Sequence, residues 1–105
     1  MAHVMMDRAE VAAALLKALS HEGRLMILCH LVGGEKSVTE LEALLGQRQA
    51  AVSQQLARLR LEGLVSTRRD GKAIYYRVID PKVLALLAVL PGLFGKAAKA
   101  PAPAR

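Results

Sequence analysis

The stretch SVTELEALLGQRQAAVSQQLARLRLEGLVSTRRDGKAIYY, residues 37–76, decides the fold. It begins with Ser37 and Glu40 at the spacing of a capping box, in which each side chain bonds the other residue's backbone at a helix start. Gly46 ends this short helix. After a tight turn, a second helix is predicted over residues 49–62. The pattern therefore predicts two short helices joined by a tight turn.

The residues that follow change from helical to β-prone periodicity. The runs 64–69 and 73–79 are strand-like, and Asp70-Gly71-Lys72 separates them. Asp-Gly between two such runs is a strong hairpin signal, because glycine accepts the positive φ that a tight turn requires. A helix pair followed by a hairpin is the arrangement of a winged helix-turn-helix.

Three further helices are predicted around this segment. The first spans residues 7–19 and carries an apolar stripe, and the second spans 21–32 with Ser20 as its cap. The centre of the second helix is apolar on nearly every side, so we expect it to be buried. Asp80-Pro81 begins the last helix, as N-cap and first helical residue. The expected fold is mainly α with a β-hairpin wing, in the order α-α-α-α-β-β-α, and forms one domain over residues 1–95.

The basic charge of the chain is concentrated in one segment. Residues 48–77 hold seven basic side chains and two acidic ones, and so carry +5 of the net charge of +6. A basic patch this localised is the electrostatic footprint of a polyanionic partner. A solvated basic face without a partner is the alternative.

The predicted helix over 49–62 has a divided surface. At 100° per residue, Val52, Leu56 and Leu59 fall together and should face the core. The second helix of such a motif presents its N-terminal residues to base edges in the major groove. The predicted DNA-binding residues of this helix are Gln49, Ala50, Ser53, Gln54 and Arg58.

The chemistry of these side chains suits DNA. Gln49 and Gln54 can pair with adenine edges, and Ser53 can bond a base or a phosphate. Ala50 is small enough to permit close approach to the groove floor. Arg58 lies further along the helix and is expected to meet phosphate. An ordinary amphipathic helix with a polar outer face is the alternative for this segment.

The predicted hairpin adds a second group of basic residues. Three basic residues lie at its tip: Arg68, Arg69 and Lys72. Their mutual repulsion is unfavourable unless a binding function compensates for it. Contact with phosphate or with the minor groove supplies such a function. Tyr76 could either pack the wing or contact the DNA backbone, and packing is the role we expect.

The segment from LKALSHEGRLMILCHLVGG to DGKAIYYRV, residues 16–78, resembles the ArsR/SmtB family of winged-helix repressors. The resemblance extends over residues 8–95. It implies a homodimer built on the first and last helices, with operator binding that an inducer releases. The DNA contacts that it implies are Gln49, Ser53 and Gln54 on the helix and Arg68, Arg69 and Lys72 on the wing.

The residues themselves also favour a homodimer. A last helix that is apolar on nearly all faces cannot be covered by so small a monomer. A two-fold dimer would place its recognition helices about one DNA turn apart and so bind an inverted repeat. We therefore expect a sequence-specific transcriptional regulator, a repressor, that binds double-stranded DNA. The alternative is a constitutive DNA-binding or protein-interaction winged-helix module without an inducer.

Three segments of the chain resemble sequences of the sulfide- and redox-responsive BigR/SqrR/HlyU-like branch of that family: ILCHL, QQLARLR and RRDGKAIYY. This resemblance implies that Cys29 is the first cysteine of a pair, but Gly95 stands at the second position. An intrachain dithiol switch is therefore chemically impossible. Reactive sulfur or an oxidant could still act on Cys29 alone, through a sulfenic acid, a persulfide, a mixed disulfide or a bridge between two copies. The alternative, which we favour, is that Cys29 is a small buried hydrophobe.

The residue types present argue against several classes of site and protein. Metal-binding members of the family carry cysteines where Ser37 and Thr39 stand, or Asp/His pairs on the last helix, so no metal site is expected. No catalytic set and no Gly-rich phosphate loop is present, so we expect neither an enzyme nor a cofactor.

Cellular location is also predicted. One cysteine, a charged N-terminus without a signal peptide and an apolar run too short for a bilayer indicate a cytoplasmic protein without membrane contact. Residues 96–105, KAAKAPAPAR, are expected to form a disordered basic tail.

Overall fold

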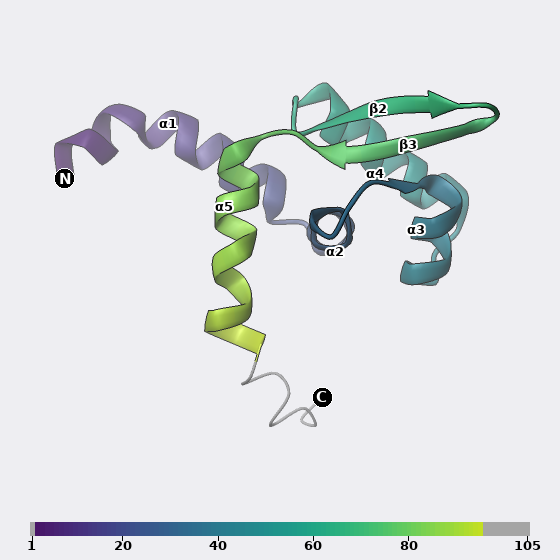
Figure 1. Ribbon diagram of the computed structural model, residues 1–105. Coiled ribbons are helices and arrows are strands. Elements are labelled where there is room, and N and C mark those ends of the chain that lie inside the picture. The colour runs from purple at the N-terminus through teal and green to yellow at the C-terminus, as the bar shows by residue number, and fades with distance from the viewer. Residues whose placement is uncertain (1, 96–105) are drawn as a thin grey trace.

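The computed structural model describes residues 2–95 and has the predicted mainly helical architecture with a hairpin at one end (Figure 1). The predicted tail over 96–105 lies outside the described residues. The elements are α1 (Ala2–Leu19), α2 (Glu22–Val32), β1 (Lys36–Ser37), α3 (Val38–Leu45), α4 (Gln49–Leu61), β2 (Val65–Asp70), β3 (Ala73–Val78), α5 (Pro81–Leu90) and a π-helical turn, η1 (Pro91–Gly95).

Local capping signals define most of the helix ends. The backbone N–H of Ser37 donates to Glu40 Oε1 at 2.8 Å, and the N–H of Glu40 donates to Ser37 Oγ at 3.1 Å, so the predicted capping box is confirmed. Gly46 ends α3 in the left-handed conformation with φ 66°. At the start of α5, Asp80 Oδ1 accepts the N–H of Lys82 at 2.8 Å, as the Asp-Pro pair predicts.

The start of α2 differs from the prediction. The cap is His21, not Ser20: the His21 Nδ1 atom accepts the N–H groups of Gly23 at 3.0 Å and Arg24 at 3.4 Å. The Ser20 hydroxyl instead donates to the Lys17 carbonyl at 2.9 Å and so closes the last turn of α1. A histidine in extended backbone conformation, φ −95° and ψ 125°, can thus perform the task usually given to a serine.

The sheet has one strand more than predicted. Its order is β1-β3-β2, with antiparallel pairing throughout and Ser37 opposite Tyr75. Because Asp70 pairs with Ala73, the hairpin loop consists of Gly71 and Lys72 alone. Gly71 has φ 66°, a conformation that glycine adopts without the strain of a Cβ. β1 was missed because two residues are too few to show an alternating pattern.

The core lies between the end of α1, the helices α2, α3, α4 and α5, and the inner face of the sheet. As predicted, Val52, Leu56 and Leu59 on α4 are fully buried. The remaining buried apolar side chains are Ala18, Leu19, Ile27, Leu28, Leu31, Leu41, Leu64, Val65, Val78, Val83 and Leu87. This packing fixes one face of α4 and leaves the opposite face open to solvent.

The expectation that the centre of α2 forms a buried helix holds for one of its faces only. Ile27 and Leu28 are fully buried, but Met26 is 44% exposed and Cys29 is exposed. α2 packs against α1, α3, α4, α5 and β3 through the face that carries Ile27 and Leu28, and the side that carries Met26 and Cys29 remains in solvent. Among the described helices, none combines the length and the apolarity that crossing a bilayer requires.

Candidate nucleic-acid interface

The outward face of α4 presents the side chains that the helical wheel predicts. Gln49, Ala50, Gln54 and Arg58 are exposed, and Ser53 is half-buried at the edge of the core. The helix starts at Gln49 without a side-chain cap, since Arg48 makes no capping hydrogen bond. The first N–H groups of α4, which begin at Gln49, therefore have no side-chain partner. This end of the helix is suited to acceptor groups on a ligand.

The tip of the hairpin lies near the start of α4, although Gln49 and Lys72 are 23 positions apart in the sequence. Both residues line one cleft of about 180 Å³, together with Ile74 and the first residues of α3. In Figure 1 the hairpin extends over α3 toward the same end of the molecule. The cleft also includes the exposed residue Thr39, which was not predicted to belong to the interface. Its position next to the capping box was the only signal in the sequence that could have indicated it.

Arg58 takes part in an exposed ion pair. Its Nε atom lies 2.9 Å from Glu62 Oε2, one helical turn away, and its side chain is 59% exposed. Exposed i, i+4 pairs contribute only a few tenths of a kcal/mol. Exchanging the carboxylate for a phosphate oxygen would therefore cost little, so Arg58 remains available to a nucleic acid.

Arg68 differs from the other basic residues of the hairpin. Its Nε atom donates to Glu35 Oε1 at 3.0 Å and lies 3.2 Å from Oε2, and its Nη2 atom also contacts Oε1. The guanidinium carbon lies 4.9 Å above the centre of the Tyr75 ring. The hydrogen bond from Arg68 holds the pKa of Glu35 below its usual range, with Arg77 adding to the effect. Glu35 was not predicted to belong to the interface, because the strand that places it was missed.

Arg69 and Lys72 are exposed, and within residues 2–95 no ion pair involves either side chain. Both are therefore free to meet an external anion. Tyr76 is half-buried and packs against the core, which confirms the packing role expected for it.

The thiol of Cys29 is exposed on α2, so the favoured prediction of a buried hydrophobe is wrong. Partial burial by its neighbours nevertheless raises the pKa of this thiol. A raised pKa lowers the fraction present as the nucleophilic thiolate. No cluster of three or more His, Cys, Asp or Glu side chains that could hold a metal ion occurs in the described part of the chain.

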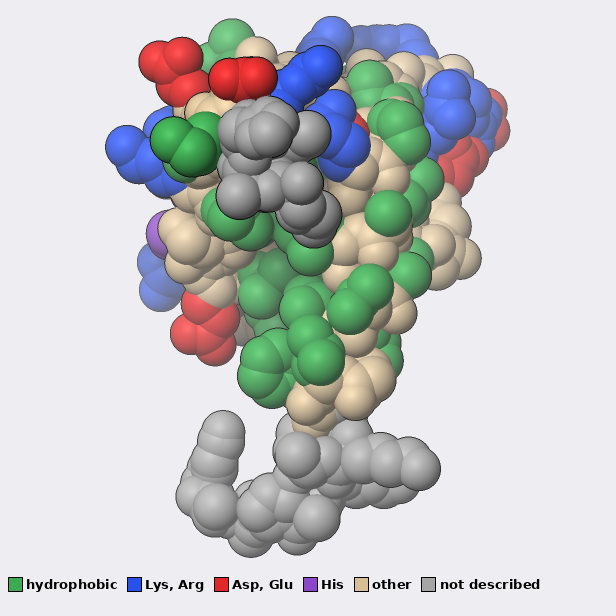
Figure 2. All heavy atoms as spheres, turned by 90° about the vertical axis from the view of Figure 1, so that its left-hand side faces the viewer, with side chains coloured by type: hydrophobic (Ala, Val, Ile, Leu, Met, Phe, Trp, Pro, Cys, Tyr) green, Lys and Arg blue, Asp and Glu red, His purple; other side chains and the backbone are tan. Residues whose placement is uncertain are grey.

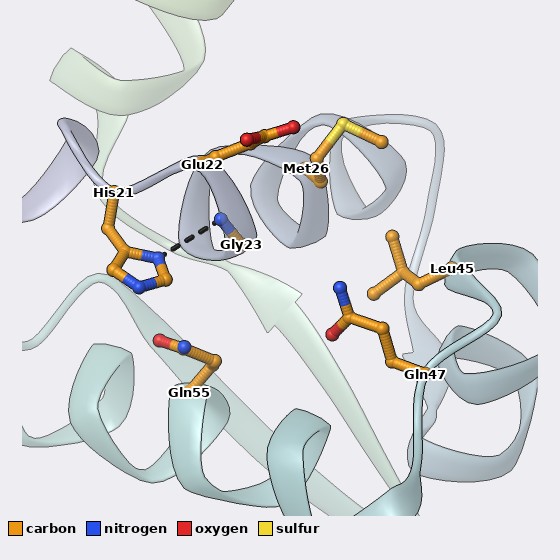
Figure 3. A pocket seen from close by; sticks show the side chains of 7 residues that line it. All are labelled: His21, Glu22, Gly23, Met26, Leu45, Gln47 and Gln55. Atoms are coloured by element: carbon orange, nitrogen blue, oxygen red, sulfur yellow. Dashed lines mark hydrogen bonds between the residues drawn. The ribbon is translucent and has the colours of Figure 1, made fainter.

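A hollow of about 520 Å³ lies between the start of α2, the end of α3 and the middle of α4 (Figure 3). Gln47, Gln55 and Met26 line it, together with His21, whose Nδ1 atom is engaged in capping α2. Figure 3 shows the Gln55 side chain pointing from α4 toward His21. Gln55 therefore faces α2, whereas its neighbour Gln54 is on the outward face.

Comparison with known proteins supports the same arrangement. The model of a family described as "Bacterial regulatory protein, arsR family" matches residues 21–67. The biofilm growth-associated repressor of Agrobacterium fabrum is 49% identical over 90 residues, which cover 86% of this chain and 77% of that protein. The transcriptional activator HlyU of Vibrio cholerae is 43% identical over 86 residues, or 82% of this chain and 80% of the relative.

Solved structures agree with these similarities. The crystal structure of the transcriptional repressor BigR from Xylella fastidiosa matches with a TM-score of 0.86 at 47% identity, over 90% of this chain and 96% of that one. The regulator HlyU from Vibrio vulnificus matches with a TM-score of 0.83 at 42% identity, over 88% and 96% of the two chains. The predicted winged helix-turn-helix fold is confirmed.

Proposed function

Since the chain belongs to the arsR family of bacterial regulatory proteins, it is a DNA-binding transcriptional regulator and not an enzyme, and we propose that it binds an inverted-repeat operator as a homodimer. The observation that carries this proposal is the exposed N-terminal face of α4 beside the hairpin tip, joined by the cleft that Gln49 and Lys72 share. The relative from Agrobacterium fabrum and the structural neighbour BigR are named repressors, whereas HlyU of Vibrio cholerae is named an activator. Repression is the mode of action that we propose.

The interface divides by chemistry. Gln49, Ala50, Ser53 and Gln54 approach the bases, because they occupy the N-terminal half of α4, the part of a recognition helix that reaches base edges. Arg58, Arg69 and Lys72 meet phosphate oxygens. Arg68 belongs to the same surface, but its pairing with Glu35 gives it a different role, which is developed in the next subsection.

An uncovered apolar surface supports the homodimer. Figure 2 shows apolar side chains gathered over the face that includes α5. The exposed apolar residues of α1, α5 and η1 are Met6, Val11, Leu16, Leu84, Val89, Leu93 and Phe94. α1 and α5 lie on the side of the molecule away from the hairpin tip (Figure 1), so pairing there leaves the DNA-binding elements free. A two-fold pair of such surfaces presents two copies of α4 to the two halves of an inverted repeat.

Cys29 is the place where an inducer would act. Its exposure supports reaction with an oxidant or with sulfane sulfur, and the single thiol limits the products to a sulfenic acid, a persulfide, a mixed disulfide or a bridge between two copies. The raised pKa of the thiol favours slow reaction at neutral pH.

Titration with a labelled duplex from the DNA upstream of its own gene tests the proposal, with a random duplex of equal length for comparison. The Gln54→Ala variant is expected to weaken operator binding by about 1–3 kcal/mol for each bidentate adenine pair, with little loss on random DNA. Gln55→Ala is the matched control, since it removes the same side chain one position along, on the face toward α2. Equal losses for Gln54→Ala on both duplexes would contradict base recognition.

Two further outcomes separate the remaining alternatives. If the wild-type protein binds operator and random DNA alike, with steep salt dependence on both, its binding is constitutive and sequence-independent, and the proposed recognition of an inverted-repeat operator is wrong. Treatment with sulfane sulfur or peroxide should weaken operator binding by the wild-type protein and leave Cys29→Ser unchanged. Identical binding by treated, untreated and substituted protein would rule out control through the thiol.

A further inference from the structure

Glu35 and Arg68 form a brace across the sheet, separated by 33 positions in the sequence. Glu35 directly precedes β1, and Arg68 lies in β2 at the opposite edge, so the pair spans the intervening strand β3. Two hydrogen bonds from one guanidinium nitrogen and a further contact from Nη2 join the two side chains. A planar guanidinium held on a carboxylate in this way has a defined orientation, unlike the point charge of a lysine.

The strand register places the brace on the outer face of the sheet. Ser37 and Arg68 both pair with Tyr75, and Glu35 stands two residues before Ser37. Because side chains alternate along strands, Glu35, Tyr75 and Arg68 share one face. The guanidinium lies above the Tyr75 ring between them, at 4.9 Å from its centre.

The core holds only the base of the hairpin. Along β2, Val65 is buried, whereas the three residues Arg68 to Asp70 are exposed, and the loop at Gly71 and Lys72 is exposed as well. β1 pairs with β3 only as far as Tyr75, so beyond that residue the hairpin is a two-stranded ribbon. Backbone pairing between β2 and β3 does not by itself set the pitch of this ribbon against α4. The brace acts where the hairpin becomes two-stranded: the β2 side chains from Arg68 on are exposed, and on β3 Ala73 and Ile74 are only half-buried.

We propose that Glu35 is a positioning residue for DNA recognition: it holds Arg68 so that the hairpin tip, with Arg69 and Lys72, stays beside the start of α4. Arg68 then anchors the wing and leaves phosphate contact to its neighbours. This inference rests on the wing touching DNA, as proposed above. The proposal implies that the acidic residue Glu35 strengthens binding to polyanionic DNA, although the net charge alone would predict the opposite effect.

The test measures affinity for operator and random duplexes over a series of salt concentrations with the full chain. Glu35→Gln removes the anchor, and Arg68→Lys keeps the positive charge but loses the two-pronged geometry. Each variant is expected to lower the ratio of operator affinity to random-DNA affinity by about 1.4- to fivefold per protomer, the range of coupling found for exposed ion pairs. The double variant should lose no more than either single one, because both break the same brace.

Glu62→Gln is the matched control. It removes the same charge and breaks the same kind of Arg–Glu pair, but that pair joins the last turn of α4 to its own C-cap residue and cannot hold the wing. The control should leave the ratio of affinities unchanged. Thermal melting of each variant establishes that the fold is retained; all three substituted side chains lie at the surface.

Two results would overturn the proposal. One is that Glu35→Gln behaves like Glu62→Gln and leaves the ratio unchanged. The other is that Arg68→Gln lowers the salt slope by about 0.9 or more, the change expected when one phosphate is no longer neutralised, which would make Arg68 a phosphate ligand. Arg69→Gln tests the premise separately: if it leaves binding and salt slope unchanged, the wing does not touch DNA and the proposed interface fails with it.

Discussion

Shortening a single apolar side chain on α5 should weaken the proposed homodimer measurably. Val89 is 53% exposed in the single chain, so about half of its side chain is available for burial by a partner. Val89→Ala removes two carbons, each worth about 0.8 kcal/mol on full burial. Half of that is about 0.8 kcal/mol for each protomer. A two-fold interface contains the residue twice, which gives about 1.6 kcal/mol and a dissociation constant raised about 15-fold.

Sedimentation equilibrium over a range of protein concentrations measures this change directly, since it yields the dimer dissociation constant. Leu61→Ala is the control: Leu61 is 85% exposed but ends α4, where it lines a groove with Ala57, Arg60 and Tyr76, away from the α5 face. The reasoning is refuted if Val89→Ala leaves the dissociation constant within a factor of two, or if Leu61→Ala raises it as much. A stronger variant, Val89→Asp, should leave the protein monomeric at concentrations where the wild type is dimeric, because pairing would bury a carboxylate.

Two predictions concern the fold that presents the interface. Leu56→Ala opens a cavity under α4 and should lower the free energy of unfolding, measured by urea denaturation, by about 2–5 kcal/mol. Leu44 is half-exposed, so Leu44→Ala should lower the free energy of unfolding clearly less. Equal losses would contradict the assigned core. Burial tends to raise the pKa of Asp80, but the N–H and ammonium groups of Lys82 outweigh it and the pKa is lowered. The stability that Asp80 supplies is therefore complete above pH about 4, the pKa of an unfolded aspartate, and is lost as the pH falls through the lower pKa of the folded state. The difference in Tm between the wild type and Asp80→Ala should accordingly shrink in acid. A difference that stays constant with pH would refute this linkage.

Signals that act over three or four residues were predictable from the sequence. The Ser37–Glu40 capping box and the Asp80 cap formed as expected, because these side chains bond to backbone within the same helical turn. The inward face of α4 followed from the helical period alone. One amphipathic stripe in a short helix has only one way to be buried.

Burial on other elements could not be predicted in the same way. Cys29 lies in an apolar segment of α2, yet it is exposed, because the chain covers only one face of that helix. His21 replaced Ser20 as the cap, since both side chains could accept the free N–H groups and the backbone direction between α1 and α2 decided which one did.

By itself, the sequence determined the winged helix-turn-helix order, the outward face of α4 and the concentration of basic charge in residues 48–77. Only the tertiary structure brought Lys72 to the cleft at Gln49, and only it showed that Glu35 holds Arg68. The physical reason is separation along the chain. Caps and amphipathic stripes act within one element, whereas the brace depends on a two-residue strand that becomes a strand only by pairing with β3.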